Sequence, residues 1–194
     1  VQGKKLSFDE ETARIYDVVA PHNDRAHFEA ILKKIDALLP GPGTTAERVG
    51  AFREQFIIPR DKLEPVFKAA IAGCREQTLK HLKLPANESF DLEFVTNKPW
   101  GGYNWYKGNY HSLIQVNVEL PIYIDRAIDI GCHEGYPGHH VYNMLLEQHL
   151  ANERHWQEFS VYPLFSPQSL IAEGSANYGI EMAFPQAERR RFEH

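Results

Sequence analysis

One short stretch of the chain brings together the residue types that activate water at a metal ion. Cys132 to His140 reads Cys-His-Glu-Gly-Tyr-Pro-Gly-His-His, and a further glutamate, Glu173, follows on a later segment. Neutral imidazole and carboxylate groups are the ligands that suit zinc and its neighbours. Glu134 stands beside the first histidine, where a metal-activated water needs a proton acceptor. The pattern therefore indicates a metal-dependent hydrolase.

The spacing of the histidines does not fit a regular helix. Metal-binding histidines on one helix face are usually four residues apart, whereas His139 and His140 come six and seven residues after His133. Six residues turn a helix by about 600°, so His139 would point away from His133. Seven residues turn it by about 700°, which aligns His140 with His133 but places it about 10 Å further along the axis.

Pro137 makes a regular helix improbable in this stretch. It lacks an amide hydrogen and clashes with the carbonyl one turn back, while Gly135 and Gly138 add conformational freedom. A bulge that takes up the two extra residues would bring His139 to the place of the usual second ligand. We therefore prefer His139 as the ligand beside His133, with His140 as the alternative or as a hydrogen-bond donor behind it.

Two glutamates complete the predicted site. Glu134 would act as the general base, taking a proton from the metal-bound water and handing it to the leaving amine. Glu173 would be the third protein ligand, on a helix whose Gly174 and Ala176 leave room for close packing. Three protein ligands plus water make the open arrangement of a catalytic zinc site. We therefore expect one Zn²⁺ ion as the cofactor.

The elements that must position these residues are mainly helical. Apolar residues recur with helical spacing before residue 85 and again after residue 121, whereas Ser89–Thr96 and Tyr110–Val118 alternate apolar and polar residues as strands do. The fold expected is mainly α with a small β-sheet, an α+β class. Residues 1–194 would form one domain, or a fragment of a longer one, with a helical part at 1–85, the sheet at 86–120 and the metal-site helices at 121–194.

Side chains near the strands are candidates for substrate contact. The segment Lys98–Asn109 is rich in glycine and aromatic residues and reads as a loop or hairpin, equally typical of core packing and of a substrate wall. Tyr103, Tyr106, His111 and Arg126 could contact a substrate or polarise its carbonyl group.

Composition narrows the classes of function. The formal charge is 21 − 26 = −5 with no long basic run, so no nucleic-acid binding is expected. No apolar run approaches the roughly 20 residues of a membrane span, and no signal peptide is evident, so we expect a soluble protein of undefined compartment. Cys74 and Cys132 are the only cysteines, and nothing in their placement favours a disulfide.

Two motifs together resemble the DUF885 family, bacterial proteins regarded as zinc metallopeptidases. They are His-Glu-x-x-Pro-Gly-His-His at His133–His140 and Glu-Gly-x-Ala-x-Tyr at Glu173–Tyr178. Leu6–Glu11 and the Gln115–Asn117 strand are also similar to that family, so the resemblance covers most of the chain.

The resemblance implies a zincin-like fold of the glutamate-ligand type, with a small sheet whose edge strand lines the cleft. It implies zinc held by His133, one of His139 and His140, and Glu173, with Glu134 as the catalytic acid and base. On such a fold, the strand Tyr110–Val118 could bind an extended peptide as a neighbouring strand.

Two departures from the family pattern leave other functions open. Ser175 stands where the family often has tryptophan, and family members are typically much longer, so groups that stabilise the oxyanion are expected to be missing here. The leading hypothesis is a zinc peptidase acting on a peptide or other small amide. One alternative is a catalytically silent or truncated scaffold or binding domain with a vestigial metal site. A hydrolase of non-peptide bonds is the other. Independently of that choice, Gly135–Gly138 could be a simple turn between two helices, with the neighbouring histidines capping carbonyl groups. The oligomeric state is not indicated.

Overall fold

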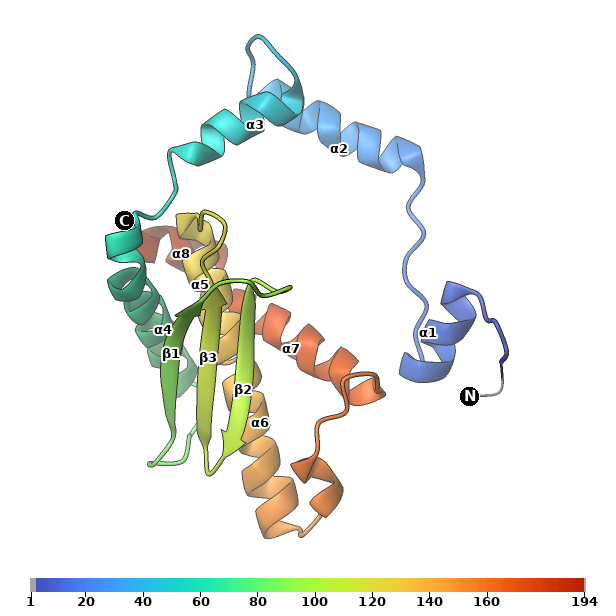
Figure 1. The fold of residues 1–194 in the computed structure, drawn as a ribbon, viewed down its shortest axis with the longest axis vertical. Coiled ribbons are helices and arrows are strands. Elements are labelled where there is room, and N and C mark those ends of the chain that lie inside the picture. Colours follow the sequence, from blue (N-terminus) through green and yellow to red (C-terminus); the bar gives the residue numbers. More distant parts are fainter. Residues whose placement is uncertain (1–2, 194) are drawn as a thin grey trace. The chain divides into compact units, whose positions relative to one another are not determined.

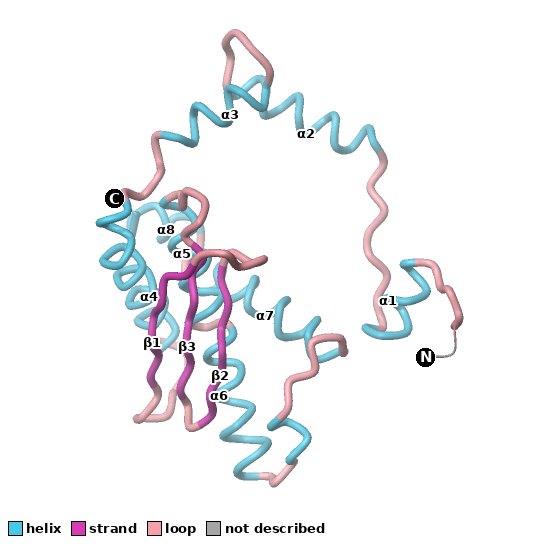
Figure 2. Tube along the Cα trace, viewed as in Figure 1, coloured by secondary structure: helices cyan, strands magenta, loops and turns pink. Residues whose placement is uncertain are grey.

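The computed structural model describes residues 3–193, which fall into two units (Figures 1 and 2). The first unit comprises residues 3–57 with 165–167, and the second comprises residues 58–164 with 168–193. The boundary expected near residue 85 between helices and sheet lies inside the second unit. That unit holds every residue predicted for the metal site.

The first unit consists of three capped helices. They are α1 (Phe8–Tyr16), α2 (Arg25–Leu38) and α3 (Thr45–Glu54). The side chains of Ser7, Asp24 and Thr44 each accept a hydrogen bond from a backbone amide of the first turn, which satisfies a donor that the helix itself leaves free. No residue within these helices is buried, so the core lies in the second unit.

The second unit begins with a long helix and continues into the sheet and the motif. Its elements are α4 (Leu63–Leu79), β1 (Ser89–Val95), β2 (Gly102–Gly108), β3 (His111–Asn117), α5 (Ile124–Ile130), α6 (His139–Leu145), α7 (Pro167–Ala183) and α8 (Gln186–Glu193). This composition confirms a mainly helical α+β fold. Among residues 3–193, no helix is both long enough and apolar enough to cross a lipid bilayer.

The sheet corrects one expectation about substrate binding. Its strand order is β1-β3-β2, with β3 parallel to β1 and antiparallel to β2. The strand expected to receive a peptide, Tyr110–Val118, contains β3 and is therefore already paired on both sides. The expected loop Lys98–Asn109 contains β2, which turns back after Gly108 and covers that side of β3. The two outer strands of the sheet are thus β1 and β2, and β3 has no open edge.

One face of the sheet packs against the helices. Ser112, Ile114 and Val116 on β3 are fully buried, while the residues that alternate with them are partly exposed. Figure 1 shows α5 and α6 running behind this sheet. The motif segment therefore lies against the sheet on one side and against α4 on another, where it adds Cys132 and Tyr136 to the core.

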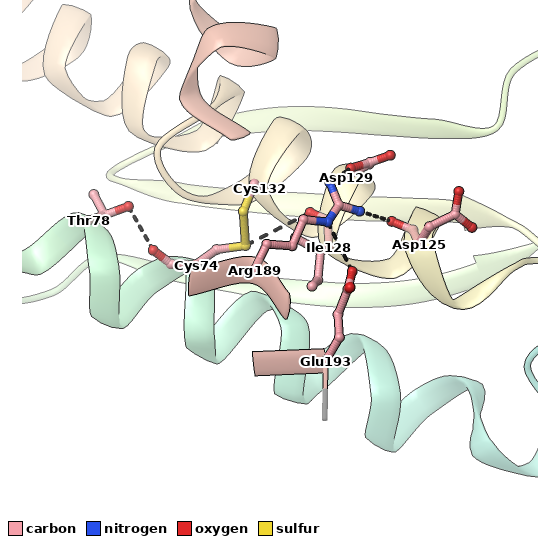
Figure 3. Close-up of a disulfide and its surroundings, with 8 residues drawn as sticks. All are labelled: Cys74, Thr78, Asp125, Ile128, Asp129, Cys132, Arg189 and Glu193. Atoms are coloured by element: carbon pink, nitrogen blue, oxygen red, sulfur yellow. Dashed lines mark hydrogen bonds and ion pairs between the residues drawn. A yellow bond between two sulfur atoms is a disulfide. The ribbon is translucent and has the colours of Figure 1, made fainter. Parts of the chain in front are cut away.

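A disulfide ties α4 to the motif. Cys74 in α4 is bonded to Cys132, and both residues are fully buried (Figure 3). The sequence did not favour this bond, because 58 positions separate the two cysteines and only the packing of α4 against the motif brings them together. Arg189 of α8 donates hydrogen bonds to the Asp129 carboxylate, at 2.7 Å, and to the Asp125 carbonyl, at 2.8 Å, which attaches α8 to α5. Figure 3 labels these three residues beside the disulfide.

Removing the disulfide is expected to destabilise the protein. A cross-link that closes a loop of this length lowers the entropy of the unfolded chain by an amount worth about 4 kcal/mol. We expect Cys74→Ala combined with Cys132→Ala to lower the free energy of unfolding by roughly that amount, measured by urea denaturation. A reductant should shift the wild-type midpoint in the same direction and leave the double variant unchanged. An identical midpoint with and without reductant would contradict the expectation.

Candidate metal centre

Three side chains from separate elements converge in the second unit. The Nε2 atoms of His133 and His139 lie 3.1 Å apart. Oε2 of Glu173 lies 3.3 Å from Nε2 of His133, and Oε1 of Glu173 lies 3.2 Å from Nε2 of His139. His133 comes from a π-helical turn, His139 begins α6, and Glu173 comes from α7.

These distances fit a single metal ion. A tetrahedral ion that is about 2.0–2.1 Å from each ligand atom separates those atoms by about 3.3 Å. Two imidazole nitrogens and a carboxylate oxygen suit zinc, and they also suit neighbouring transition metals, so the donor set is not specific to zinc. The residues present therefore fit the expected ion, and three of them leave a fourth coordination position for water or substrate.

Local backbone structure explains how histidines six positions apart meet. The chain widens into a π-helical turn at Gly131–Gly135 and leaves the helix at Tyr136. It closes a loop through a hydrogen bond of 3.0 Å from the Gly138 amide to the Cys132 carbonyl, and α6 then begins. The expected bulge is thus a π-helical turn followed by a complete break. A Cβ atom at Gly138 would lie 1.8 Å from the His133 carbonyl oxygen, so only glycine fits there.

The alternative ligand, His140, points elsewhere. Its side chain is fully buried, with Nδ1 2.7 Å from the Ser112 hydroxyl and Nε2 3.1 Å from Oε2 of Glu88. Both ring nitrogens are therefore already engaged in the core. The geometry brings His139, and not His140, to His133 and Glu173.

Electrostatic surroundings favour the protonation state of a ligand at His139. Burial lowers the pKa of His139, and the neighbouring His133 lowers it further, against the opposing effect of Glu173. A neutral imidazole is the form that binds metal ions. The side chains of His133 and His139 are 19% and 13% exposed, whereas that of Glu173 is 57% exposed. The histidine pair is thus the inner part of the cluster.

Glu134 is buried beside the cluster. Burial and the negative charge of Glu173 raise its pKa to about 8. A cation bound nearby would oppose this shift, because it favours the ionised carboxylate. Glu134 lies against the start of β2, where a Cβ atom at Gly102 would stand 3.1 Å from its Oε1 atom. The side-chain amide of Asn104 on β2 donates a hydrogen bond of 2.7 Å to the backbone carbonyl of Glu134, which holds this turn to the sheet.

A cavity of about 310 Å³ joins these groups to the open edge of β2. Five consecutive residues of β2, from Gly102 to Tyr106, form one wall, and Glu134 and the three clustered side chains form another. The predicted substrate contacts Tyr103 and Tyr106 therefore line the cavity. Asn143, Tyr162 and Leu164 complete its lining.

The other two predicted contacts lie outside this cavity. His111 is hydrogen-bonded at 3.0 Å to the Ser89 hydroxyl and lies 3.4 Å from Asp91, so it links β3 to β1. Arg126 lies 3.2 Å from Asp129 on α5 and is half exposed. The structure does not bring either side chain to the cluster.

Sequence reasoning missed two polar residues that contact the motif. Asn104 is a polar residue on the inward-facing side of an alternating strand, and that position was a usable signal. Glu88 carried no signal, because it is a lone carboxylate before β1, and only the fold shows that its side chain is 2% exposed. Burial alone would raise the pKa of Glu88, but hydrogen bonds from His140, Tyr136 and Arg75 outweigh burial and lower it to about 2.

Comparison of the chain with protein-family models, with curated proteins and with solved structures finds no match. The chemistry of this centre is therefore argued from its own residues.

The glycine at the helix break provides a direct test of the site. Gly138→Ala would place a methyl group against the His133 carbonyl, so we expect a loss of about 3 kcal/mol in unfolding free energy and a loss of bound metal. Thermal unfolding and metal stoichiometry measure the two effects.

Gly174→Ala is the matched control. A Cβ atom at Gly174 meets nothing within 4 Å, and alanine is the better helix former, so this variant should gain about 0.5–1 kcal/mol and keep its metal. Equal losses in both variants would contradict the role assigned to the break.

Proposed function

We propose that this protein is a metal-dependent hydrolase that cleaves amide bonds, with peptides as the substrate class and zinc as the ion. The observation that carries the proposal is the convergence of His133, His139 and Glu173 within 3.1–3.3 Å of one another, beside the buried Glu134. A fully enclosed four-ligand structural site would have no use for an adjoining cavity or for a second carboxylate, Glu134, that is not a ligand.

The residues divide the chemistry between them. When bound, the zinc ion supplies Lewis acidity, which polarises the substrate carbonyl group and acidifies a water molecule. Glu134 accepts the proton of that water and later donates it to the leaving amine, so it begins and ends the cycle ionised. Because the Glu134 side chain is buried, bulk water does not compete with it for the proton.

The open edge of β2 supports a peptide as the substrate. The Asn117 amide donates to the Gly101 carbonyl at 2.9 Å, which makes these two residues a hydrogen-bonded pair of the antiparallel ladder. By alternation, Tyr103 and Trp105 also direct their backbone groups towards β3. The backbone groups of Gly102, Asn104 and Tyr106 therefore face the open edge, along the cavity wall. An extended peptide can pair with them and present its carbonyl group to the cluster.

Glu134→Gln separates chemistry from metal binding. The amide keeps the size of the side chain but cannot accept the proton, so turnover should fall by about 10²–10⁴-fold while one equivalent of metal is retained. Elemental analysis and a peptide-library screen provide the two measurements. Unchanged turnover would remove Glu134 from the mechanism.

Glu173→Ala should lose the metal as well as the activity. Glu181→Ala, an exposed position further along α7, is the control and should keep both. If freshly purified wild-type protein contains no metal and takes none up on titration, the proposal fails in favour of a silent binding domain.

Backbone methylation of a cleaved peptide tests the role of β2. Methyl groups at every second amide near the scissile bond should raise KM by about tenfold or more, because each removes a ladder hydrogen bond, whereas methylation of the intervening amides should have little effect. A uniform response along the peptide would exclude strand pairing.

A further inference from the structure

A buried carboxylate contacts the metal-ligand segment from outside the cavity. Oε1 of Glu88 accepts a hydrogen bond of 2.8 Å from Nε of Arg75 and lies 2.7 Å from Nη2 of the same guanidinium. Oε2 accepts the hydroxyl of Tyr136 and lies 3.1 Å from Nε2 of His140. Both oxygens are therefore fully used, one by α4 and the other by the motif.

The two groups on Oε2 come from either side of a metal ligand. Tyr136 begins the helix break and His140 follows His139, so a single oxygen atom holds both ends of the segment that carries His139. The rings of Tyr136 and His140 also pack edge to face, with centroids 5.0 Å apart. The Ser112 hydroxyl of β3 meets the other nitrogen of His140 at 2.7 Å. The orientation of His140, and with it the start of α6, is fixed on two sides.

The same helix holds the other ligand. Cys74, which precedes Arg75 in α4, is bonded to Cys132, which precedes His133. Two adjacent residues of α4 are thus connected to the two ligand-bearing segments, one through a covalent bond and the other through Glu88.

Stability alone does not account for this arrangement. The side chain of Glu88 is 2% exposed, whereas that of Arg75 is 43% exposed. Burying the carboxylate costs free energy that its attraction to the guanidinium only partly repays, and an apolar residue of similar size often serves a core as well. What the charged group adds is direction, because its three hydrogen-bonding partners, Arg75, Tyr136 and His140, fix it in one position.

We propose that Glu88 is a positioning residue. Together with Arg75 and the Cys74–Cys132 bond, it sets the separation of His133 and His139 and thereby the affinity of the site for metal. The inference rests on the proposed function only in taking the ion to be the ligand of this cluster.

Metal affinity in variants tests the inference. Cobalt(II), whose visible absorption reports coordination geometry, is titrated into the metal-free protein in competition with a chelator. Glu88→Gln, which keeps the shape but removes the charge, should bind the ion about 10–100-fold more weakly than wild type and with an altered spectrum. Tyr136→Phe removes only one hydroxyl group and should weaken binding by several-fold.

Coupling between the two positions gives a sharper result. Glu88→Gln and Tyr136→Phe both alter contacts at Oε2 of Glu88. The loss of cobalt-binding free energy in the double variant should therefore be smaller than the sum of the losses in the two single variants.

Phe67→Leu is the matched control. Phe67 is fully buried in α4 and packs against Phe94, away from Glu88, so this change lowers stability without touching the network. Its cobalt affinity and spectrum should equal those of wild type. An equal loss of affinity in Phe67→Leu, or wild-type affinity in both Glu88→Gln and Tyr136→Phe, would overturn the positioning role and leave the proposed function intact.

A second measurement covers the case in which wild-type protein takes up no ion. That result defeats the proposed function, and the positioning role is then decided on metal-free protein by long-range ¹H–¹⁵N spectra of the histidine rings. Glu88→Gln should change the ring signals of His139 as well as those of His140, while Phe67→Leu should change neither. A His139 signal that stays constant in Glu88→Gln would overturn the inference.

Discussion

The cluster depends on one constraint, which is that residues six positions apart cannot meet on a continuous helix. The hydrogen bond from the Gly138 amide to the Cys132 carbonyl resolves this constraint, because it closes the break over which His139 returns to His133. The π-helical turn before the break rotates His133 into place. Without this closure α7 would still present Glu173, but to a single imidazole, and one imidazole with one carboxylate is a weak site for a divalent ion.

Each element around the break holds the backbone of this segment in place through a specific contact. α4 holds it through a covalent bond at Cys132 and through the Arg75–Glu88 pair. The sheet holds it through Asn104, and β2 leaves space for Glu134 where it has a glycine instead of a side chain. The histidine side of the site is thus held by α4 and the sheet, whereas Glu173 is contributed by α7 and is more exposed to solvent.

Local chemistry could be predicted from the sequence, and long-range pairing could not. The helix break was predicted because Pro137 and Gly138 act within a few residues of one another, and the preference for His139 over His140 followed from it. The main helices and the strands β1 and β3 carried clear periodicity. The prediction that the strand Tyr110–Val118 has an open edge was wrong, because strand order depends on contacts between distant segments and β3 lies between β1 and β2. The Cys74–Cys132 bond and the role of Glu88 were not predicted, for the same reason.

The open edge of β2 also bears on how the protein behaves in concentrated solution. An unpaired strand edge accepts any extended chain, including the strand of another copy, and so invites self-association. Here the pairing register shifts between Tyr106 and Gly108, and the charged Lys107 occupies the irregular position. Bulges and lysines of this kind make an edge hard to extend. The part of the edge that can accept another strand is thereby confined to the few residues of β2 that border His133, His139 and Glu173, and it is too short to nucleate a long sheet between copies.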